Sequence, residues 1–421
     1  MLVGGSVRDL LLGYEPKDFD IEAYGLDPSI LRTLLEEFGQ VNAVGEKFTV
    51  YKLAFVEQAP STATLPADTE GSAQRFEIDV SIPRRESKSG KGHRGFSVTG
   101  DPFMTFEDAA RRRDFTVNAI LLDPLTGERV DPFGGISDLE HRVLRVVAPE
   151  TFVEDSLRVL RAVQFAARFE MTIDPGTIEL CRSIDLSDLP AERIWGEIEK
   201  LLLMSRKPSI GLRAALDIGV LDKLFPELKA LSGCPLDPVT HPEGDVFTHT
   251  ALCLDKAAES ISELPKGKAV TVMMAVLLHD AGKPLVTHQI NGKVVAPGHD
   301  KAGLEPARDV LSRLGLHSVS GYDVNSQVLA LVREHSRPSE FYRDREGLPD
   351  SAFRRLARTV DLDLLYRVSL ADAMGRGPAS SSLAQEWFIR KARELGVDHG
   401  PPAPLLLGRH LLEAGFPTGP A

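Results

Sequence analysis

Two glycines near the start of this chain are followed by two aspartates in one strand-like run, and this combination restricts the fold more than any other feature. Gly4 and Gly5 lie in LVGGSVRDLLLG, and the run DFDIEAY comes soon after. Glycine lets the backbone pass close to a bulky group, and a helix that begins there directs N–H groups at a phosphate. In a strand Asp18 and Asp20 share one face, where two carboxylates repel unless a cation lies between them. The pattern predicts a nucleotide site with Mg²⁺ held by carboxylates and phosphates.

A third carboxylate would complete a site for metal-dependent nucleotidyl transfer. The run FEIDVSIP offers Asp79, which alternates with apolar Ile78 and Val80 as in a strand with one polar face. Glu77 shares that face and is the less favoured choice.

The rest of the chain divides by pattern. With 421 residues it is long enough for two to four domains. Short strands alternate with helices in the first part, and from about Asp138 the pattern is helical almost throughout. We therefore expect an α+β protein with a head over 1–137, a helical neck and body over 138–231, a second helical domain over 232–376 and a helical tail over 377–421.

Charge and cysteine usage limit the environment and the partners. The net charge of −12 argues against bulk attraction to nucleic acid but leaves room for a local basic patch, as in RRESKSGKGHR from Arg84. No apolar run approaches the length of a membrane span and no signal peptide is evident. Cys181, Cys234 and Cys253 lie far apart, as expected for buried thiols in a reducing cytoplasm. We expect a cytoplasmic protein without a membrane partner.

Five segments resemble, in order, motifs A to E of class II tRNA nucleotidyltransferases, the CCA-adding enzymes. They are GGSVRDLLLG with DFD, RRDFTVNA, DPFGGISDL, EDSLRVLRAVQFAAR and AERIWGEIEKLL. The resemblance implies a polymerase-β-like head with a small mixed sheet, followed by an all-helical neck. It also implies template-independent addition of CCA to tRNA from CTP and ATP, with release of pyrophosphate and no DNA partner.

The same resemblance implies roles for individual residues. Asp18 and Asp20 would hold the catalytic Mg²⁺, with Asp79 as the third carboxylate. The nucleotide would be bound by Gly4, Gly5, Ser6, Arg8, Arg113, Asp114, Asn118, Asp155, Arg158 and Arg161.

Asp155 and Arg158 would select the base. They stand three apart, and Glu154 and Arg158 four apart, so we expect neighbours on one helix. A fixed arginine beside a fixed aspartate presents donors and an acceptor, as the edge of a base does.

Two alternatives remain open. The chain could add only the terminal A or only CC. Addition of CC alone is less favoured, because the loop RRESKSGKGHRGF, whose loss accompanies CC-only enzymes, is intact. It could also be a bacterial poly(A) polymerase. However, the basic run usual in those enzymes after the aspartate strand is replaced here by VGEKFTVYKL.

A second set of polar residues lies in the C-terminal half. His249, the adjacent His279 and Asp280, and Asp372 follow one another in the order H, HD, D, with an apolar run before the HD pair. This order resembles the HD phosphohydrolase superfamily, which implies an all-helical domain with a divalent transition metal at these four residues and a metal-activated water attacking a phosphoester. His299 and His335 would join a second metal or bind phosphate. A 2′,3′-cyclic or 3′-phosphate RNA end is the substrate that the resemblance suggests.

Overall fold

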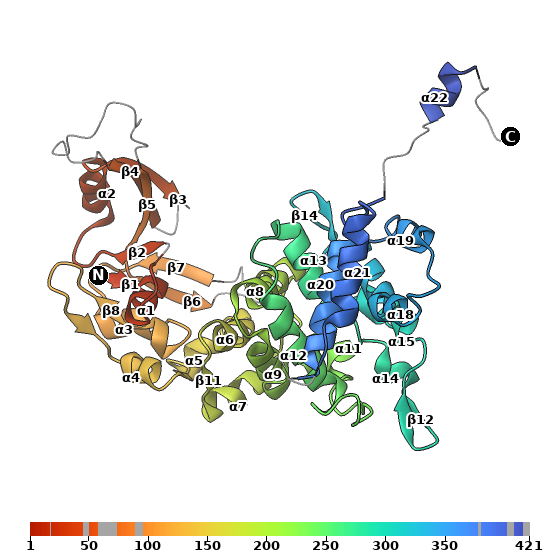
Figure 1. Ribbon diagram of the computed structural model, residues 1–421. Coiled ribbons are helices and arrows are strands. Elements are labelled where there is room, and N and C mark those ends of the chain that lie inside the picture. The colour runs from red at the N-terminus through yellow and green to blue at the C-terminus, as the bar shows by residue number, and fades with distance from the viewer. Residues whose placement is uncertain are drawn as a thin grey trace. The chain divides into compact units, whose positions relative to one another are not determined.

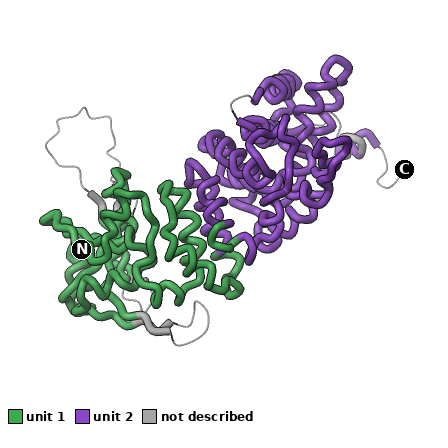
Figure 2. The backbone as a smooth tube through the Cα atoms, turned by 90° about the horizontal axis from the view of Figure 1, so that it is seen from below, with its two compact units in different colours: residues 1–193, 217–220 green, residues 194–216, 221–421 purple. Residues whose placement is uncertain are grey.

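The computed structural model describes residues 1–16, 18–44, 50–57, 74–88, 96–377, 380–401 and 408–415. The chain forms two compact units, one of residues 1–193 with 217–220 and one of residues 194–216 with 221–421 (Figure 2). The middle of the basic loop, 89–95, and parts of the expected tail, 402–407 and 416–421, lie outside the described residues.

The first unit is built on a seven-stranded mixed sheet with the order β3-β4-β5-β2-β1-β8-β9 (Figure 1). The strands are β1 (Leu2–Val3), β2 (Phe19–Glu22), β3 (Gln40–Val44), β4 (Val50–Glu57), β5 (Gln74–Ser81), β8 (Leu121–Leu122) and β9 (Arg129–Val130). β2 and β5 pair in parallel, and the other neighbours are antiparallel.

Local signals in the sequence explain where the first helices begin and end. α1 (Gly5–Leu11) follows Gly4 at φ 70° and stops before Gly13 at φ 78°, two backbone conformations that glycine adopts without strain. α2 (Pro28–Glu36) starts where the Asp27 side chain accepts the Ser29 N–H.

The packing of α2 decides which face of the sheet is free for chemistry. Leu31 of α2 lies in an apolar cluster with Tyr51 and Val80, against which Ile21 packs. Because strand side chains alternate, Asp20 and Asp79 point to the opposite face.

Smaller elements complete the first unit. They are the hairpin β6 (Arg84–Lys88) and β7 (Phe96–Gly100), the parallel pair β10 (Val143–Leu144) and β11 (Thr172–Ile173), and the helices α3 (Phe106–Arg111), η1 (Thr116–Asn118), α4 (Gly135–Glu140), α5 (Pro149–Phe152), α6 (Leu157–Arg168) and α7 (Pro175–Ser183).

The second unit is almost entirely helical. α8 (Ala191–Met204) begins in the first unit and continues in the second. The remaining helices are α9 (Pro208–Asp217), α10 (Val220–Leu224), α11 (Pro226–Lys229), α12 (Val246–Ala258), α13 (Lys266–Leu278), α14 (Lys283–Val286), α15 (His299–Ala302), α16 (Leu304–Arg313), α17 (Val324–Glu334), α18 (Arg337–Arg343), α19 (Asp350–Leu356), α20 (Leu362–Gly375), α21 (Leu383–Glu394) and α22 (Gly408–Glu413).

The expected α+β fold, with a small mixed sheet in the head and helices in the remainder, is confirmed. Three short strand pairs interrupt the part expected to be all-helical: β10 with β11, β12 (His288–Ile290) with β13 (Lys293–Val295), and β14 (Ser318–Val319) with β15 (Tyr322–Asp323). Strands this short carry too few residues for an alternating pattern to be recognised.

One helical stretch, Lys266–Val286, is long and apolar enough to cross a membrane by length and composition. This corrects the expectation that no run approaches that length. Most of its apolar window, 83%, is buried inside the protein, and α13 contacts α12, α17 and α20. A helix surrounded in this way is apolar on all sides because every side faces the core.

Candidate nucleotide pocket and candidate metal centre

The parallel pairing of β2 with β5 places two of the three predicted carboxylates side by side. Asp20 and Asp79 are direct partners in the register, and Lys52 of β4 is the partner of Asp79 on its other side. The Lys52 ammonium lies 3.1 Å from Asp79 Oδ1 and 3.1 Å from Glu77 Oε1. Asp18 directly precedes β2. Loss of hydration raises the pKa of Asp20, Arg113 opposes this rise, and Asp79 and Asp18 add to it. A cation is therefore favoured at these carboxylates.

A pocket of about 440 Å³ opens beside Asp20. Its lining residues are Gly4, Gly5, Arg8, Asp20, Arg84, Arg112, Arg113, Asp114, Asn118, Asp155, Leu157, Arg158, Arg161 and Arg193. Seven arginines against three aspartates make the pocket positive in a chain whose net charge is −12. Arginine presents several donors in a planar fork that suits phosphate oxygens.

Gly4 is required for the wall of this pocket. Besides its φ of 70°, a Cβ atom there would lie 2.9 Å from Arg113 Nη1 and 3.7 Å from Asp20 Oδ2. A side chain would thus push the arginine away from the backbone that starts α1. The sequence predicted that Gly4 lets the backbone pass close to a bulky group. In the structure the nearest such group is the Arg113 guanidinium.

A buried network holds several lining residues in place. Arg8 Nη1 donates to Asn118 Oδ1 at 2.7 Å, Asn118 Nδ2 donates to Asp114 Oδ1 at 2.9 Å, and Arg161 Nε donates to Asp114 Oδ2 at 2.6 Å. Burial opposes ionisation of Asp114, but Arg161 and the Asn118 amide hold its pKa below the ordinary value. The Arg8 guanidinium also lies 4.2 Å from the centre of the Phe169 ring. The pocket wall is therefore preorganised.

Glu22 anchors two of the pocket arginines, and the sequence did not single it out. Its Oε1 accepts from Arg112 Nη2 at 2.5 Å and from Arg113 Nη2 at 3.0 Å, while Oε2 accepts from the Tyr24 hydroxyl at 2.8 Å. Glu22 is buried, which works against ionisation, but Arg113 and Arg112 lower its pKa below the ordinary value. The available signal was the continued alternation Asp18, Asp20, Glu22 along the strand.

Replacing Glu22 by glutamine is expected to destabilise the protein by about 1–3 kcal/mol, because two arginines lose a buried carboxylate. The lowered pKa of Glu22 means that its contribution is present above the unfolded-state pKa and is lost as the pH falls through the folded-state pKa. The difference in the free energy of unfolding between parent and Glu22→Gln should therefore shrink in acid. Denaturant unfolding at pH 7 and at pH 3 checks this, and a difference independent of pH would contradict it.

Asp155 and Arg158 are not neighbours on a helix, which corrects that expectation. α6 begins only at Leu157, because the Asp155 carboxylate accepts the Leu157 N–H and lies in the turn before the helix. Asp155 Oδ2 also accepts from Arg193 at 3.1 Å. Arg158 donates to the carbonyl oxygens of Thr151 and Arg112 at 2.8 and 2.7 Å. Both side chains nevertheless line the same pocket.

The second unit brings all six predicted histidines and aspartates together. Three of the histidines use Nδ1 in the same way, toward a backbone carbonyl oxygen one turn earlier: His279 to Val276 at 2.7 Å, His299 to Ala296 at 2.9 Å and His335 to Val332 at 2.7 Å. A carbonyl oxygen only accepts hydrogen bonds, so Nδ1 carries the proton. In each neutral ring Nε2 then carries a lone pair. His279 Nε2 is buried and makes no hydrogen bond with a described group. Burial lowers the pKa of His335 to about 4, so this ring is neutral at pH 7.

Asp280 is buried and Asp372 is partly buried, and the surroundings of both lower the carboxyl pKa well below its ordinary value. Asp372 Oδ1 lies 3.1 Å from His249 Nε2, and Asp280 Oδ2 lies 3.2 Å from His279 Nε2. Burial opposes ionisation of Asp280, but the Lys283 ammonium, 2.8 Å from Oδ2, favours the carboxylate, and the pKa of Asp280 lies well below the ordinary value. Imidazole lone pairs and carboxylates are the ligands that transition metals take in proteins, so this donor set fits a divalent metal.

Glu243 supports the centre from outside and was not found in the sequence. Its Oε1 accepts from His249 Nδ1 at 2.7 Å and from His241 Nδ1 at 2.9 Å. Burial opposes ionisation, but these two bonds lower the pKa of Glu243 to about 2. A carboxylate behind a histidine fixes which ring nitrogen faces the metal and makes it more basic. The signal available was the run HPEGD before α12.

We expect Glu243→Gln to weaken metal binding by about 10- to 100-fold, as losses behind a metal-ligating histidine do. Chelator competition on the purified protein measures the affinity. Glu259→Gln, which changes an exposed carboxylate paired with Lys256, is the matched control. Equal affinities in the two variants would contradict the role of Glu243.

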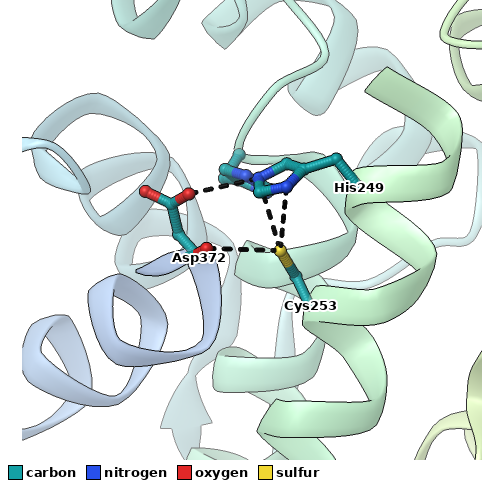
Figure 3. A group of neighbouring side chains, drawn as sticks. His249, Cys253 and Asp372 are labelled. Atoms are coloured by element: carbon teal, nitrogen blue, oxygen red, sulfur yellow. Dashed lines mark hydrogen bonds and ion pairs between the residues drawn. The ribbon is translucent and has the colours of Figure 1, made fainter. Parts of the chain in front are cut away.

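Cys253 lies beside the centre, one helical turn after His249 (Figure 3). Its Sγ is 3.4 Å from His249 Nε2 and 3.9 Å from Nδ1, and one ligand atom from each of Cys253, His249, His279 and Asp372 lies within 4.8 Å of the others. A Cβ atom on Gly375 would lie 2.4 Å from this sulfur, and glycine there allows α20, which carries Asp372, to approach α12. The cysteine therefore contacts the His249 ring and lies within reach of a metal at this centre, a residue that the sequence did not single out as a ligand. All three cysteines are buried and free, as predicted.

Comparison with known proteins places these two sites in one family. The Poly A polymerase head domain model matches residues 1–145, the model described as probable RNA and SrmB- binding site of polymerase A matches 170–231, and the HD domain model matches 246–376. The multifunctional CCA protein of Stenotrophomonas maltophilia (strain R551-3) is 38% identical over 418 residues, covering 94% of this chain and 94% of that protein. The chain belongs to the multifunctional CCA protein family. The Xanthomonas campestris pv. campestris (strain B100) member is 36% identical and covers 94% of this chain and 92% of its own length.

Solved structures agree on the fold of this CCA family member. The Thermotoga maritima CCA-adding enzyme complexed with tRNA matches with a TM-score of 0.58, 20% identity and coverage of 100% of this chain and 83% of the other. A complex of a CCA-adding enzyme with CTP matches with a TM-score of 0.60, 20% identity and coverage of 99% and 82%. At this identity the likeness concerns the fold. The resemblance to class II tRNA nucleotidyltransferases with an HD domain is confirmed.

Not every predicted residue of this CCA family member lines the nucleotide pocket. Ser6 is buried with its hydroxyl donating to the Val3 carbonyl at 2.9 Å, and the side chains of Asp18 and Asp79 lie outside the lining. Conversely, Arg84, Arg112 and Arg193 line it without having been assigned a role. A signal was available, because Arg112 lies in RRDFTVNA, Arg193 lies in AERIWGEIEKLL and Arg84 begins the basic run RRESKSGKGHR.

Proposed function

We propose that this protein adds CCA to the 3′ end of tRNA from CTP and ATP without a nucleic-acid template. The observation that carries the proposal is the pairing of Asp20 with Asp79 at an arginine-lined pocket. The names of the relatives that cover nearly the whole chain favour complete CCA addition over addition of A alone, of CC alone or of poly(A).

The proposed reaction joins the tRNA 3′-hydroxyl oxygen to the α-phosphorus while the bond to pyrophosphate breaks and pyrophosphate leaves. Mg²⁺ held by Asp18 and Asp20, with Asp79 as the third carboxylate, supplies charge neutralisation at the reacting phosphate. The Gly4–Ser6 backbone and Arg8 bind the triphosphate. Arg113, Asp114 and Asn118 orient the sugar and phosphates. The network through Asp114 holds Asp114 and Asn118 in place before the nucleotide arrives, and Glu22 holds Arg113.

We propose that Asp155 and Arg158 select the base, and that Arg161 contributes to nucleotide binding. In the free protein Asp155 and Arg158 bond to the chain itself, through Arg193 and two carbonyl oxygens. To recognise a base, Asp155 and Arg158 must break these hydrogen bonds and form new ones to the edge of C or A. Such an exchange allows one pair of side chains to serve both bases.

The test uses three labelled tRNAs that end at the discriminator base, in C or in CC. Each is incubated with Mg²⁺ and CTP, ATP or both, and sized to single-nucleotide resolution. Extension of all three to CCA is the expected result. Extension of the CC-ended tRNA alone would identify an A-adding enzyme, failure after CC would identify a CC-adding enzyme, and long A-tails would identify a poly(A) polymerase.

We also propose that the HD centre is a metal-dependent phosphohydrolase acting on 2′,3′-cyclic or 3′-phosphate RNA ends, which block nucleotide addition. A divalent transition metal held by His249, His279, Asp280 and Asp372 supplies an activated water. Lys283 and Arg376, which contact Asp280 and Asp372, add positive charge where a phosphate would lie. RNA ends of both kinds incubated with Mn²⁺, Co²⁺, Ni²⁺ or Zn²⁺ test this, and no turnover with any of them would refute it.

As to organisation, we propose the division into a head (1–137), a neck and body (138–231), an HD domain (232–376) and a tail (377–421), with the neck and body contacting the acceptor arm. We place the protein in the cytoplasm, where its three buried free thiols would stay reduced.

A further inference from the structure

A second cavity lies in the helical unit, outside both proposed active sites. Its volume is about 430 Å³, and small-molecule sites typically measure about 300–1,000 Å³. The residues that line it all belong to the second unit, and none of them belongs to the HD centre or to the nucleotide pocket. Three parts of the chain supply them: the turn before α9 with Arg206 and Lys207, α12 with Leu252, Asp255, Lys256, Ala258 and Glu259, and the end of α20 with Met374, Gly375 and Gly377.

The uncharged part of the lining is apolar and partly without side chains. Leu252 and Ala258 belong to α12 and Met374 belongs to α20, and these two helices lie side by side (Figure 1). Gly375 allows this close approach, since a Cβ atom there would collide with Cys253 Sγ. The face of a planar ring can pack against such a surface, and a methionine sulfur makes favourable contacts with aromatic rings.

The two carboxylates of the lining already have partners in the protein. Glu259 pairs with Lys256 at 2.9 Å. Asp255 accepts both the N–H and the hydroxyl of Ser209, at 2.9 and 2.6 Å. These two bonds fix the first turn of α9 against α12, and they therefore also hold the backbone of the basic pair that directly precedes α9.

Arg206 and Lys207 thus line the cavity from a backbone held in place. Arg206 is exposed and has no ion-pair partner among the residues that the structure describes. A guanidinium without a carboxylate partner suits a phosphate, whose oxygens match its planar fork of donors. The carboxylates of the lining can accept hydrogen bonds from sugar hydroxyls. An apolar surface, donors for a phosphate and acceptors for hydroxyls together match the base, the phosphate and the ribose of one nucleotide.

We infer that this cavity binds a ribonucleotide, with its base on the apolar surface and its phosphate at Arg206. The site is separate from the nucleotide pocket of the head, and the inference goes beyond both proposed activities. A free ribonucleotide and an unstacked nucleotide of an RNA chain present the same base, ribose and phosphate, so the shared chemistry defines the ligand. The turn before α9 and two helices of the HD domain would hold it together, and one of these helices, α20, also carries Asp372.

The experiment locates the bound nucleotide in the full chain by photochemical labelling. One arm irradiates the protein with 8-azidoadenosine 5′-monophosphate, and the other irradiates it with a tRNA that lacks CCA. After digestion, mass spectrometry of the peptides separates labels at this cavity from labels in the head. We expect adducts within 252–259 or 374–377. 8-Azidoadenosine, which lacks the phosphate, should label these peptides about 10-fold less, because it loses the charge-assisted bonds to the arginine.

Two variants test the cavity in different ways. Arg206→Gln should lower the labelling about 10-fold by removing the phosphate donor, and Ala258→Trp should abolish it by filling the space without a change of charge. Arg213→Gln, which changes an exposed arginine of α9 outside the lining, is the matched control and should label as the parent does. Thermal melting checks that the variants are folded.

The two arms identify the source of the ribonucleotide. Adducts from the monophosphate alone would support a free nucleotide, adducts from the tRNA alone would support a nucleotide of RNA, and adducts from both would support a site that accepts either. No adduct at these peptides in either arm, or labelling that is unchanged in Arg206→Gln and Ala258→Trp, would overturn the inference. CCA addition and hydrolysis of phosphate ends are assayed separately, so that outcome would leave both proposed activities standing.

Discussion

Asparagine in place of Asp20 should slow nucleotide addition by about 10³-fold or more, since a metal contributes several kcal/mol to the transition state and each 1.36 kcal/mol is tenfold in rate. Asp20 is the carboxylate that lies both in the pocket lining and beside Asp79 in the sheet. The amide keeps the size of the side chain and removes its charge, so the effect reports on cation binding. Single-turnover addition of AMP to a CC-ended tRNA is the measurement.

The control for this prediction lies on the next strand. Asp79→Asn should also be strongly impaired, whereas Glu77→Gln, which changes the other carboxylate on the same face of β5, should keep most of the activity. The Asp20→Asn protein should hydrolyse phosphate ends at the parental rate, which shows that it is folded. Equal losses at Glu77 and Asp79 would contradict the choice of Asp79 as the third carboxylate.

Replacing Asp280 by asparagine should abolish hydrolysis of phosphate ends, by about 10³-fold or more, and leave CCA addition intact. Asp280 Oδ2 lies beside His279 Nε2 and Oδ1 lies beside His299 Nε2, so the loss of this carboxylate should also release the bound metal. Hydrolysis of a 3′-phosphate RNA and metal content are measured on the same preparation.

Asp300 provides the matched control for Asp280. It follows His299 directly, as Asp280 follows His279, but lies in the first turn of α15 with no assigned part in the centre. Asp300→Asn should keep the hydrolysis and the metal. Hydrolysis that survives in Asp280→Asn would refute the proposed centre, and a simultaneous loss of CCA addition would indicate misfolding.

Features that depend on neighbours in the chain could be predicted from the sequence. The turn at Gly4, the cap of α2 by Asp27, the buried helix α13 and the division into a mixed-sheet head and a helical remainder all follow from local conformational preferences and periodicity. The helix expected to carry both Asp155 and Arg158 was wrong for a local reason too. The spacing suits a helix, but Asp155 forms a hydrogen bond to the backbone before the helix starts.

The charged residues that hold the site residues in place could not be predicted from local sequence patterns. Glu22 meets Arg112 and Arg113 across the head, Glu243 supports His249 from a loop, and His335 meets His299 from another helix. The sequence alone determined which side chains capable of catalysis or metal binding this protein carries and which kinds of elements hold them. Through its ordered motifs it also determined the family. The tertiary structure decided which of them face each other, because hydrogen bonds and ion pairs depend on distances of a few ångströms between residues far apart in the chain, and no local pattern encodes those distances.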